Sequence, residues 1–216
     1  MHRIIMVLLA VMVCGAGLQA QDVRARYLKT RIGREKAVLL DQNGGSAATE
    51  KAVAAALEFF RLQQEKDGRW SPEELVKRLG DNPPRLADAK YKVDDTSIDV
   101  PLTGMVLLCF SGAGPDAVRQ YQDTYIPGLK YLRSMQKDDG GFGGKNYTNA
   151  ICAMALLEAY AVTGDKEVRA AAEKTVNLLI SRQCELGGWG YTTADKRNDT
   201  SVTGWVVWAL SMADDL

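Results

Sequence analysis

Two kinds of predicted helix alternate along most of this chain. The first kind is amphipathic, with apolar residues at helical spacing on one side and charged residues on the other. It is predicted over residues 48–66, 116–136 and 166–183. The second kind is apolar all round, which is typical of a buried helix. It is predicted over residues 101–111, 147–162 and 203–212. Each amphipathic helix precedes an apolar one, so the pattern predicts an all-α array of hairpins with outer amphipathic and inner apolar helices.

Each amphipathic helix leads into the same short string: Gln, three residues, Gly, one residue and an aromatic. The defining pairs are Gln64 and Trp70, Gln136 and Phe142, and Gln183 and Trp189. Because Gly adopts the left-handed conformation that ends many helices, we expect the Gln in the last helical turn and the Gly at or just past the C-cap. The Gln amide can then reach backbone groups of the neighbouring hairpin, which predicts a structural role for the string.

The repeats divide the chain into segments. Residues 21–47 are a polar N-terminal segment, with a helix predicted over 26–40, and the hairpins occupy 48–216. The first two copies of the string are farther apart than the last two by about the length of 71–96, which we interpret as an insertion. The starts of the inner helices align in register. They read Thr103-Gly104, Asn149-Ala150 and Thr203-Gly204.

The first 20 residues have the pattern of a secretory signal peptide. A basic start precedes an apolar run over 4–13, and small residues lead to a predicted cleavage site after Ala20. The run is too short to span a bilayer as a helix. We therefore expect a secreted or periplasmic protein without a transmembrane span. The formal net charge of zero and the lack of a basic stripe argue against a nucleic-acid partner.

Metal and cofactor sites are not expected. His2 is the only histidine in the sequence, and removal of the signal peptide would leave the mature chain without one. That excludes a Ser-His or Cys-His nucleophile and any histidine-ligated metal site. The remaining cysteines lack the spacing of a zinc site. Cys109 and Cys152 lie in predicted inner helices, so we expect two buried structural thiols there, with Cys184 at a helix end.

The repeated string resembles the QW motif of the terpenoid cyclases, the family of squalene–hopene and oxidosqualene cyclases. Their α/α toroid is shared with the β subunits of protein prenyltransferases. The chain as a whole looks most like the secreted prenyltransferase and squalene-oxidase repeat proteins of bacteria, whose inner helices often start like residues 199–205. The resemblance implies a toroid of about six hairpins, of which residues 48–216 supply three. Because the sequence stops in mid-helix at Leu216, we expect a fragment; pairing of two arcs into a ring is the alternative.

The same resemblance implies a catalytic acid. Cyclases of this family protonate an alkene with the middle Asp of a DxDD motif, and this chain has Lys92-Val93-Asp94-Asp95-Thr96. The last two acids and the Thr match the motif, whereas Lys92 replaces the first Asp. The resemblance therefore implies Asp94 as the acid and Asp95 as its partner. The alternative is that Asp95 or Thr96 caps the following helix.

Two further groups of residues are candidates for ligand binding. Asp99 and Asp199 recur at the starts of inner helices, where they either line a shared cavity or act as capping and dipole residues. Tyr147, Trp205 and Trp208 lie on inner helices, as does Tyr160; they either stabilise a carbocation, as the resemblance implies, or are ordinary core residues. The prenyltransferase reaction itself fits poorly, because it requires a zinc site that includes His.

Two functions follow from these observations. The first is a terpenoid-cyclase-like protein, which as an enzyme would be a proton-initiated cyclase or isomerase of an apolar polyene. The second is a non-catalytic binding or scaffold module that uses the concave face of the helical array for a peptide, glycan or lipid.

Overall fold

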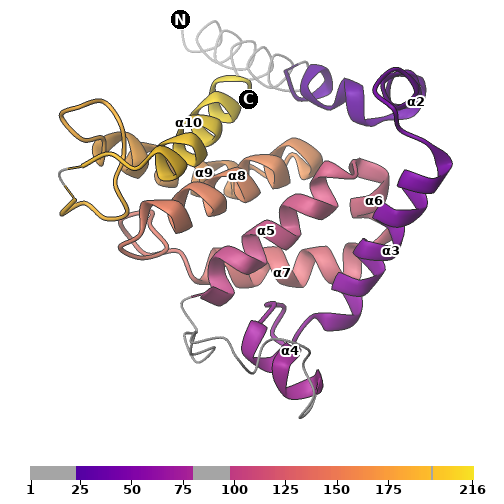
Figure 1. The fold of residues 1–216 in the computed structure, drawn as a ribbon, viewed down its shortest axis with the longest axis horizontal. Coiled ribbons are helices and arrows are strands. Elements are labelled where there is room, and N and C mark those ends of the chain that lie inside the picture. The colour runs from indigo at the N-terminus through magenta and orange to yellow at the C-terminus, as the bar shows by residue number, and fades with distance from the viewer. Residues whose placement is uncertain (1–22, 80–97, 196) are drawn as a thin grey trace, which may run out of the picture.

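The computed structural model describes residues 23–79, 98–195 and 197–216 (Figure 1). This part of the chain is built from helices and connecting loops, as the sequence predicts. Residues 23–28 are helical and lead into a short 3-10 helix. The remaining elements follow in chain order. They are η1 (Lys29–Arg31), α2 (Gly33–Gln42), α3 (Ala47–Gln63), α4 (Pro72–Leu79), α5 (Asp99–Gly112), α6 (Pro115–Gln120), α7 (Gln122–Ser134), α8 (Asn146–Thr163), α9 (Lys166–Ser181) and α10 (Thr200–Asp214).

The described helices form three hairpins. Their outer helices are α3, α7 and α9, and the inner helices that follow them are α5, α8 and α10. Helix α8 lies between α5 and α10 and also packs against α9 and α7, so it is the centre of the arrangement (Figure 1). Its entire length from Thr148 to Ala161 is buried. The prediction of an inner helix apolar on all sides is thus confirmed for α8.

The two flanking inner helices are less buried than predicted. On α10, the side chains of Val207 and Trp208 are 53% and 59% exposed. On α5, Cys109 is exposed, so the expectation of a buried thiol there was wrong, whereas Cys152 on α8 is buried. The reason is position in the array: α8 has an inner helix on each side, whereas α5 and α10 each have one inner neighbour among the described elements.

Two helix predictions need correction. The helix expected over 116–136 is interrupted at Tyr121, where the backbone leaves the helical region, and α7 then continues through Pro127 and Gly128. Gly128 instead serves packing, since a Cβ there would lie 2.8 Å from the Trp70 ring. The helix expected over 26–40 breaks at Ile32, whose extended backbone separates η1 from α2.

The N-terminal segment is tied to the end of α8. The carboxylate of Glu158 is buried there, and the Arg31 guanidinium donates to it at 2.8 Å while the Tyr27 hydroxyl donates at 2.9 Å. The Arg24 side chain also donates to the carbonyl oxygen of Ala161 at 3.0 Å. A buried charge is tolerated only when it is paired and hydrogen-bonded. Glu158 therefore depends on the N-terminal segment for its partners.

Candidate functional site

The repeated string forms the same compact turn in each hairpin. In every copy, the N–H that follows the Gln donates to the carbonyl of the residue after the Gly. The three pairs are Glu65 to Arg69 at 2.9 Å, Lys137 to Gly141 at 2.8 Å, and Cys184 to Gly188 at 2.8 Å. The glycines have φ values of 94°, 85° and 85°. The Gln lies at or just past the C-cap rather than in the last helical turn as predicted, and the left-handed Gly belongs to this separate turn.

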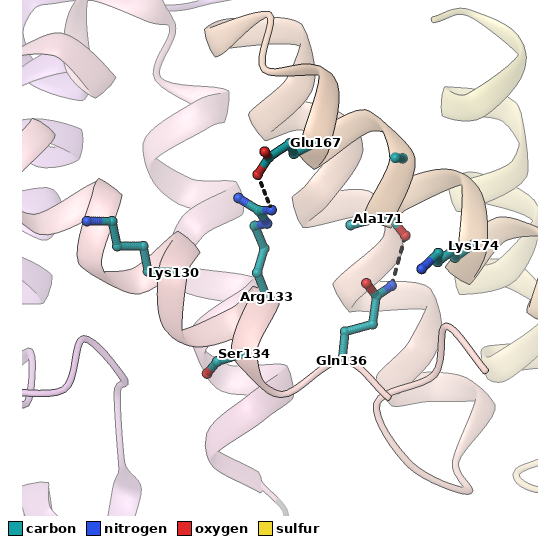
Figure 2. A pocket seen from close by; sticks show the side chains of 8 residues that line it. Lys130, Arg133, Ser134, Gln136, Glu167, Ala171 and Lys174 are labelled. Carbon is teal, nitrogen blue, oxygen red and sulfur yellow. Dashed lines mark hydrogen bonds and ion pairs between the residues drawn. The ribbon is translucent and has the colours of Figure 1, made fainter. Parts of the chain in front are cut away.

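The Gln side chains connect neighbouring hairpins in two of the three copies. Gln64 Nε2 donates to the carbonyl of Thr124 in α7 at 2.8 Å. Gln136 Nε2 donates to the carbonyl of Ala171 in α9 at 2.8 Å, a bond that Figure 2 shows. In the third copy, the bond from Gln183 Nε2 is to Gly187 of its own turn, at 2.7 Å. These contacts support the structural role expected for the string.

The backbone N–H of each aromatic residue fixes the register of the following inner helix. The acceptors are the aligned side chains Thr103 for Trp70 at 3.1 Å, Asn149 for Phe142 at 2.7 Å, and Thr203 for Trp189 at 3.0 Å. The alignment of inner-helix starts inferred from the sequence is therefore present in space. Since each inner helix starts at its turn, the starts of α5, α8 and α10 lie at the same end of their hairpins.

Asp99 is buried at the start of α5. It is 3% exposed and lies beside one residue of the first turn, Arg69, and one that follows it, Ser71. The Nε atom of Arg69 is 3.1 Å from its carboxylate, and the Ser71 hydroxyl donates a hydrogen bond to it. Burial raises the pKa of Asp99, and this outweighs the opposing effects of Ser71 and Arg69. The Arg69 Nε–H is close to the carboxylate but not aligned with it, so this buried donor makes no hydrogen bond.

Asp199 has a different environment. It is the N-cap of α10, where its side chain accepts from the Val202 N–H at 2.9 Å and from the Ser201 hydroxyl at 2.5 Å. These hydrogen bonds, that of Ser201 first, lower the pKa of Asp199. Asp99 and Asp199 thus engage separate partners, and the structure gives them different local roles despite their matching sequence positions.

Three of the four predicted aromatic residues form one continuous run. Tyr147 at the start of α8 meets Trp205 of α10 edge to face, with ring centroids 5.7 Å apart, and Trp205 stacks on Trp208 at 5.9 Å. Trp208, at 59% exposed, presents this run to solvent. The fourth, Tyr160, is instead buried between the guanidinium groups of Arg24 and Arg169, each 5.4 Å from its ring centroid.

Comparison of the sequence with models of protein families shows which family this helical array belongs to. The model of the squalene-hopene cyclase C-terminal domain matches residues 73–215, about two thirds of the chain. The chain belongs to this family. Neither the curated proteins nor the solved structures yielded a match. Across the ranges that the structure describes, no helix is both long and apolar enough to cross a membrane.

The cyclase-type acids lie outside the described residues. Asp94 and Asp95 fall in the segment 80–97, inside the family match, and residues 1–20 with the predicted signal peptide also lie outside. The nearest described carboxylate in the sequence is Asp99. Its partners Arg69 and Ser71 were not anticipated, because a salt bridge between a turn and the next inner helix leaves no periodic signal in the sequence.

Several hollows in the described part of this cyclase-family domain are open grooves. One of about 470 Å³ lies between α7 and α9, over the link from Gln136 to Ala171 (Figure 2). Its walls are charged, and an ion pair of 2.8 Å between Arg133 and Glu167 spans it. Such a groove does not suit an apolar ligand. The aromatic run on α8 and α10 is the better candidate surface.

Proposed function

We propose that this chain is a secreted terpenoid-cyclase-like protein that binds an apolar polyene at the aromatic run and isomerises it by protonation. The observation that carries the proposal is the contact of Tyr147, Trp205 and Trp208, with Trp208 59% exposed. A large aromatic surface left in solvent is a typical ligand-binding feature. Membership of the squalene-hopene cyclase family supports a polyene as the ligand.

The aromatic run suits both the ligand and a cation formed from it. Ring faces bind hydrocarbon by burial of apolar area, and they attract cations with about 0.5–2 kcal/mol per favourable contact. Trp205 and Trp208 are nearly parallel, with 21° between their planes, so they present an extended π surface. A carbocation held near this surface would be stabilised without a base that captures it.

The acid in this proposal is Asp94, with Asp95 as its hydrogen-bonding partner. A carboxylic acid breaks its O–H bond and protonates one carbon of an alkene, which leaves a carbocation at the other carbon. The Asp94 carboxylate then takes a proton from a neighbouring carbon, which restores the acid and gives an isomer without any further reactant. Five residues after Asp94 in the sequence, burial raises the pKa of Asp99 at the start of α5.

A non-catalytic binding module is the second candidate, and one observation favours it. Several hollows of the described residues are open to solvent, whereas carbocation chemistry needs a site that excludes water. In this alternative the array binds a peptide, glycan or lipid on its concave face and releases it unchanged. The two candidates share the aromatic run and differ in the need for Asp94.

The test combines binding with product analysis. The purified chain is titrated with linear polyprenols in detergent while tryptophan fluorescence is recorded, and extracts are analysed by mass spectrometry for isomers. We expect Trp208→Ala to weaken binding about tenfold or more, the loss of one buried aromatic contact. Phe59→Ala is the matched control, because Phe59 on α3 is a comparably exposed aromatic at 48%.

Product analysis then separates the two candidates. Isomer formation by the wild type and its loss in Asp94→Asn, with binding retained, supports the enzyme. Binding without product in both proteins supports the binding module. Equal binding by the wild type and Trp208→Ala would remove the aromatic run as the site and with it the proposal.

A further inference from the structure

The third hairpin leaves uncovered the surface that the first two hairpins bury. Gly68 and Gly140 are buried, and a Cβ on them would lie 2.4 Å from the Pro127 carbonyl oxygen and 2.7 Å from the Lys174 carbonyl oxygen of the next outer helix. Gly187 is exposed, and a Cβ there would meet nothing within 4 Å. The third turn is therefore built to receive an outer helix that the described residues do not place there.

The inner helix of the third hairpin shows the same vacancy. A Cβ on Gly104 of α5 would lie 3.2 Å from the Ile151 side chain of α8, so this glycine permits close approach of two inner helices. The aligned Gly204 of α10 is exposed and has nothing within 4 Å of such a Cβ. Together, Gln183, Gly187 and Gly204 define a surface that we call the tail surface.

The contacts between hairpins one and two, and between hairpins two and three, indicate which residues would fit the tail surface. Gln64 binds the carbonyl of Thr124, and Gln136 binds the carbonyl of Ala171. Each acceptor lies twelve residues before the Gln of its own hairpin, and counting back in the same way from Gln64 gives Ala52 on α3. The glycine contacts at Pro127 and Lys174 correspond to Ala55 in this register.

Helix α3 is uncovered at these positions. Gly128 and Thr175, eight residues before their respective Gln, are buried under the preceding turn, and the bond from Gln136 to the Thr175 hydroxyl is 2.9 Å. Their counterpart Ala56 is exposed, as are Ala52 and Ala55. Small residues permit a turn to approach closely, so α3 has the form of a receiving helix on which none of the described residues is seated. We call Ala52, Ala55 and Ala56 the head surface.

We infer that a second copy of this chain docks head to tail, with its α3 on the tail surface. Gln183 Nε2 of one copy would donate to the Ala52 carbonyl of the other, and Gly187 would lie against Ala55, as at the two junctions within the chain. The head and tail surfaces are different, so the contact is heterologous and its repetition closes a ring or continues as a chain. The inference does not use the proposed polyene chemistry, although Trp208 lies one helical turn after Gly204 on α10, so a docked copy would lie next to the aromatic run.

The test is the self-association of the full chain. Sedimentation velocity from about 1 to 100 µM protein covers the range in which interfaces of moderate affinity dissociate. We expect Ala56→Arg to abolish association, because the added side chain occupies the space of the docked turn. Gln183→Ala should weaken it about tenfold through loss of one hydrogen bond. Both positions are exposed in the single copy, so neither change should disturb folding, which far-UV circular dichroism checks.

The matched control is Ala54→Arg on the same helix. Its counterparts Ile126 and Glu173 remain exposed after their hairpins have packed, so an arginine there should leave association unchanged. A mixture of Ala56→Arg and Gln183→Ala should associate more strongly than Ala56→Arg alone, since the Gln183→Ala copy provides an intact head and the Ala56→Arg copy an intact tail. The inference is overturned by a wild-type monomer throughout this range, by association that survives Ala56→Arg, or by a mixture that behaves as Ala56→Arg does.

Discussion

Substitution of the three turn glycines by alanine measures how each turn is packed. All three have φ near 90°, where an alanine costs about 1–2 kcal/mol, partly offset by about 0.4–1 kcal/mol from the less flexible unfolded chain. Gly68→Ala must also push the Pro127 carbonyl away from 2.4 Å, and such overpacking adds about 1–3 kcal/mol. In Gly140→Ala the new Cβ would lie 2.7 Å from the Lys174 carbonyl oxygen, so we expect a similar overpacking cost. Gly187→Ala meets nothing and should cost about 1 kcal/mol or less.

The assay is urea unfolding of the three variants at submicromolar concentration, where a docked second copy does not contribute. We expect Gly68→Ala and Gly140→Ala to lower the unfolding midpoint clearly at an unchanged slope, and Gly187→Ala to shift it little. The three variants share the cost of the backbone conformation. Differences between their free energies of unfolding therefore report how closely a helix packs over each turn. Equal destabilisation by all three would refute the reasoning, because the third turn would then be covered within a single copy.

Two further predictions concern buried charges. Arg31→Met should destabilise the chain by about 2–4 kcal/mol in urea unfolding, because it removes the guanidinium that pairs with the buried Glu158 carboxylate. Glu158→Gln in that background should recover part of the loss. A cost near zero for Arg31→Met would contradict this dependence on the N-terminal segment. The raised pKa of Asp99 means that the folded state binds its proton more tightly than the unfolded state. The stabilisation that protonated Asp99 provides is therefore complete below about pH 3.9 and is lost as pH rises through the folded-state pKa. Over that rise, Asp99→Asn should gain stability relative to the wild type. A difference between the two proteins that stays constant with pH would contradict it.

The local pattern of the sequence determined the architecture. Periodicity distinguished outer from inner helices, and repetition of the Gln-Gly-aromatic string placed the turns. The alignment of Thr103, Asn149 and Thr203 also gave the register of the inner helices, which their hydrogen bonds to the turns bear out. These features depend on residues close in the chain or repeated at a fixed spacing, so they are visible without coordinates.

Tertiary structure alone decided how identical motifs differ. The sequence gives Gly68 and Gly187 the same setting, yet one is packed against α7 and the other is open, because only neighbours in space distinguish them. In the same way, Asp99 and Asp199 match in sequence, but burial beside Arg69 raises the pKa of the first and capping lowers that of the second. The burial of Glu158 with Arg31, 127 positions earlier, has no local signature either. The burial of a side chain and its pairing with another depend on contacts between segments distant in the sequence. Those contacts decide where in the array a functional site can lie.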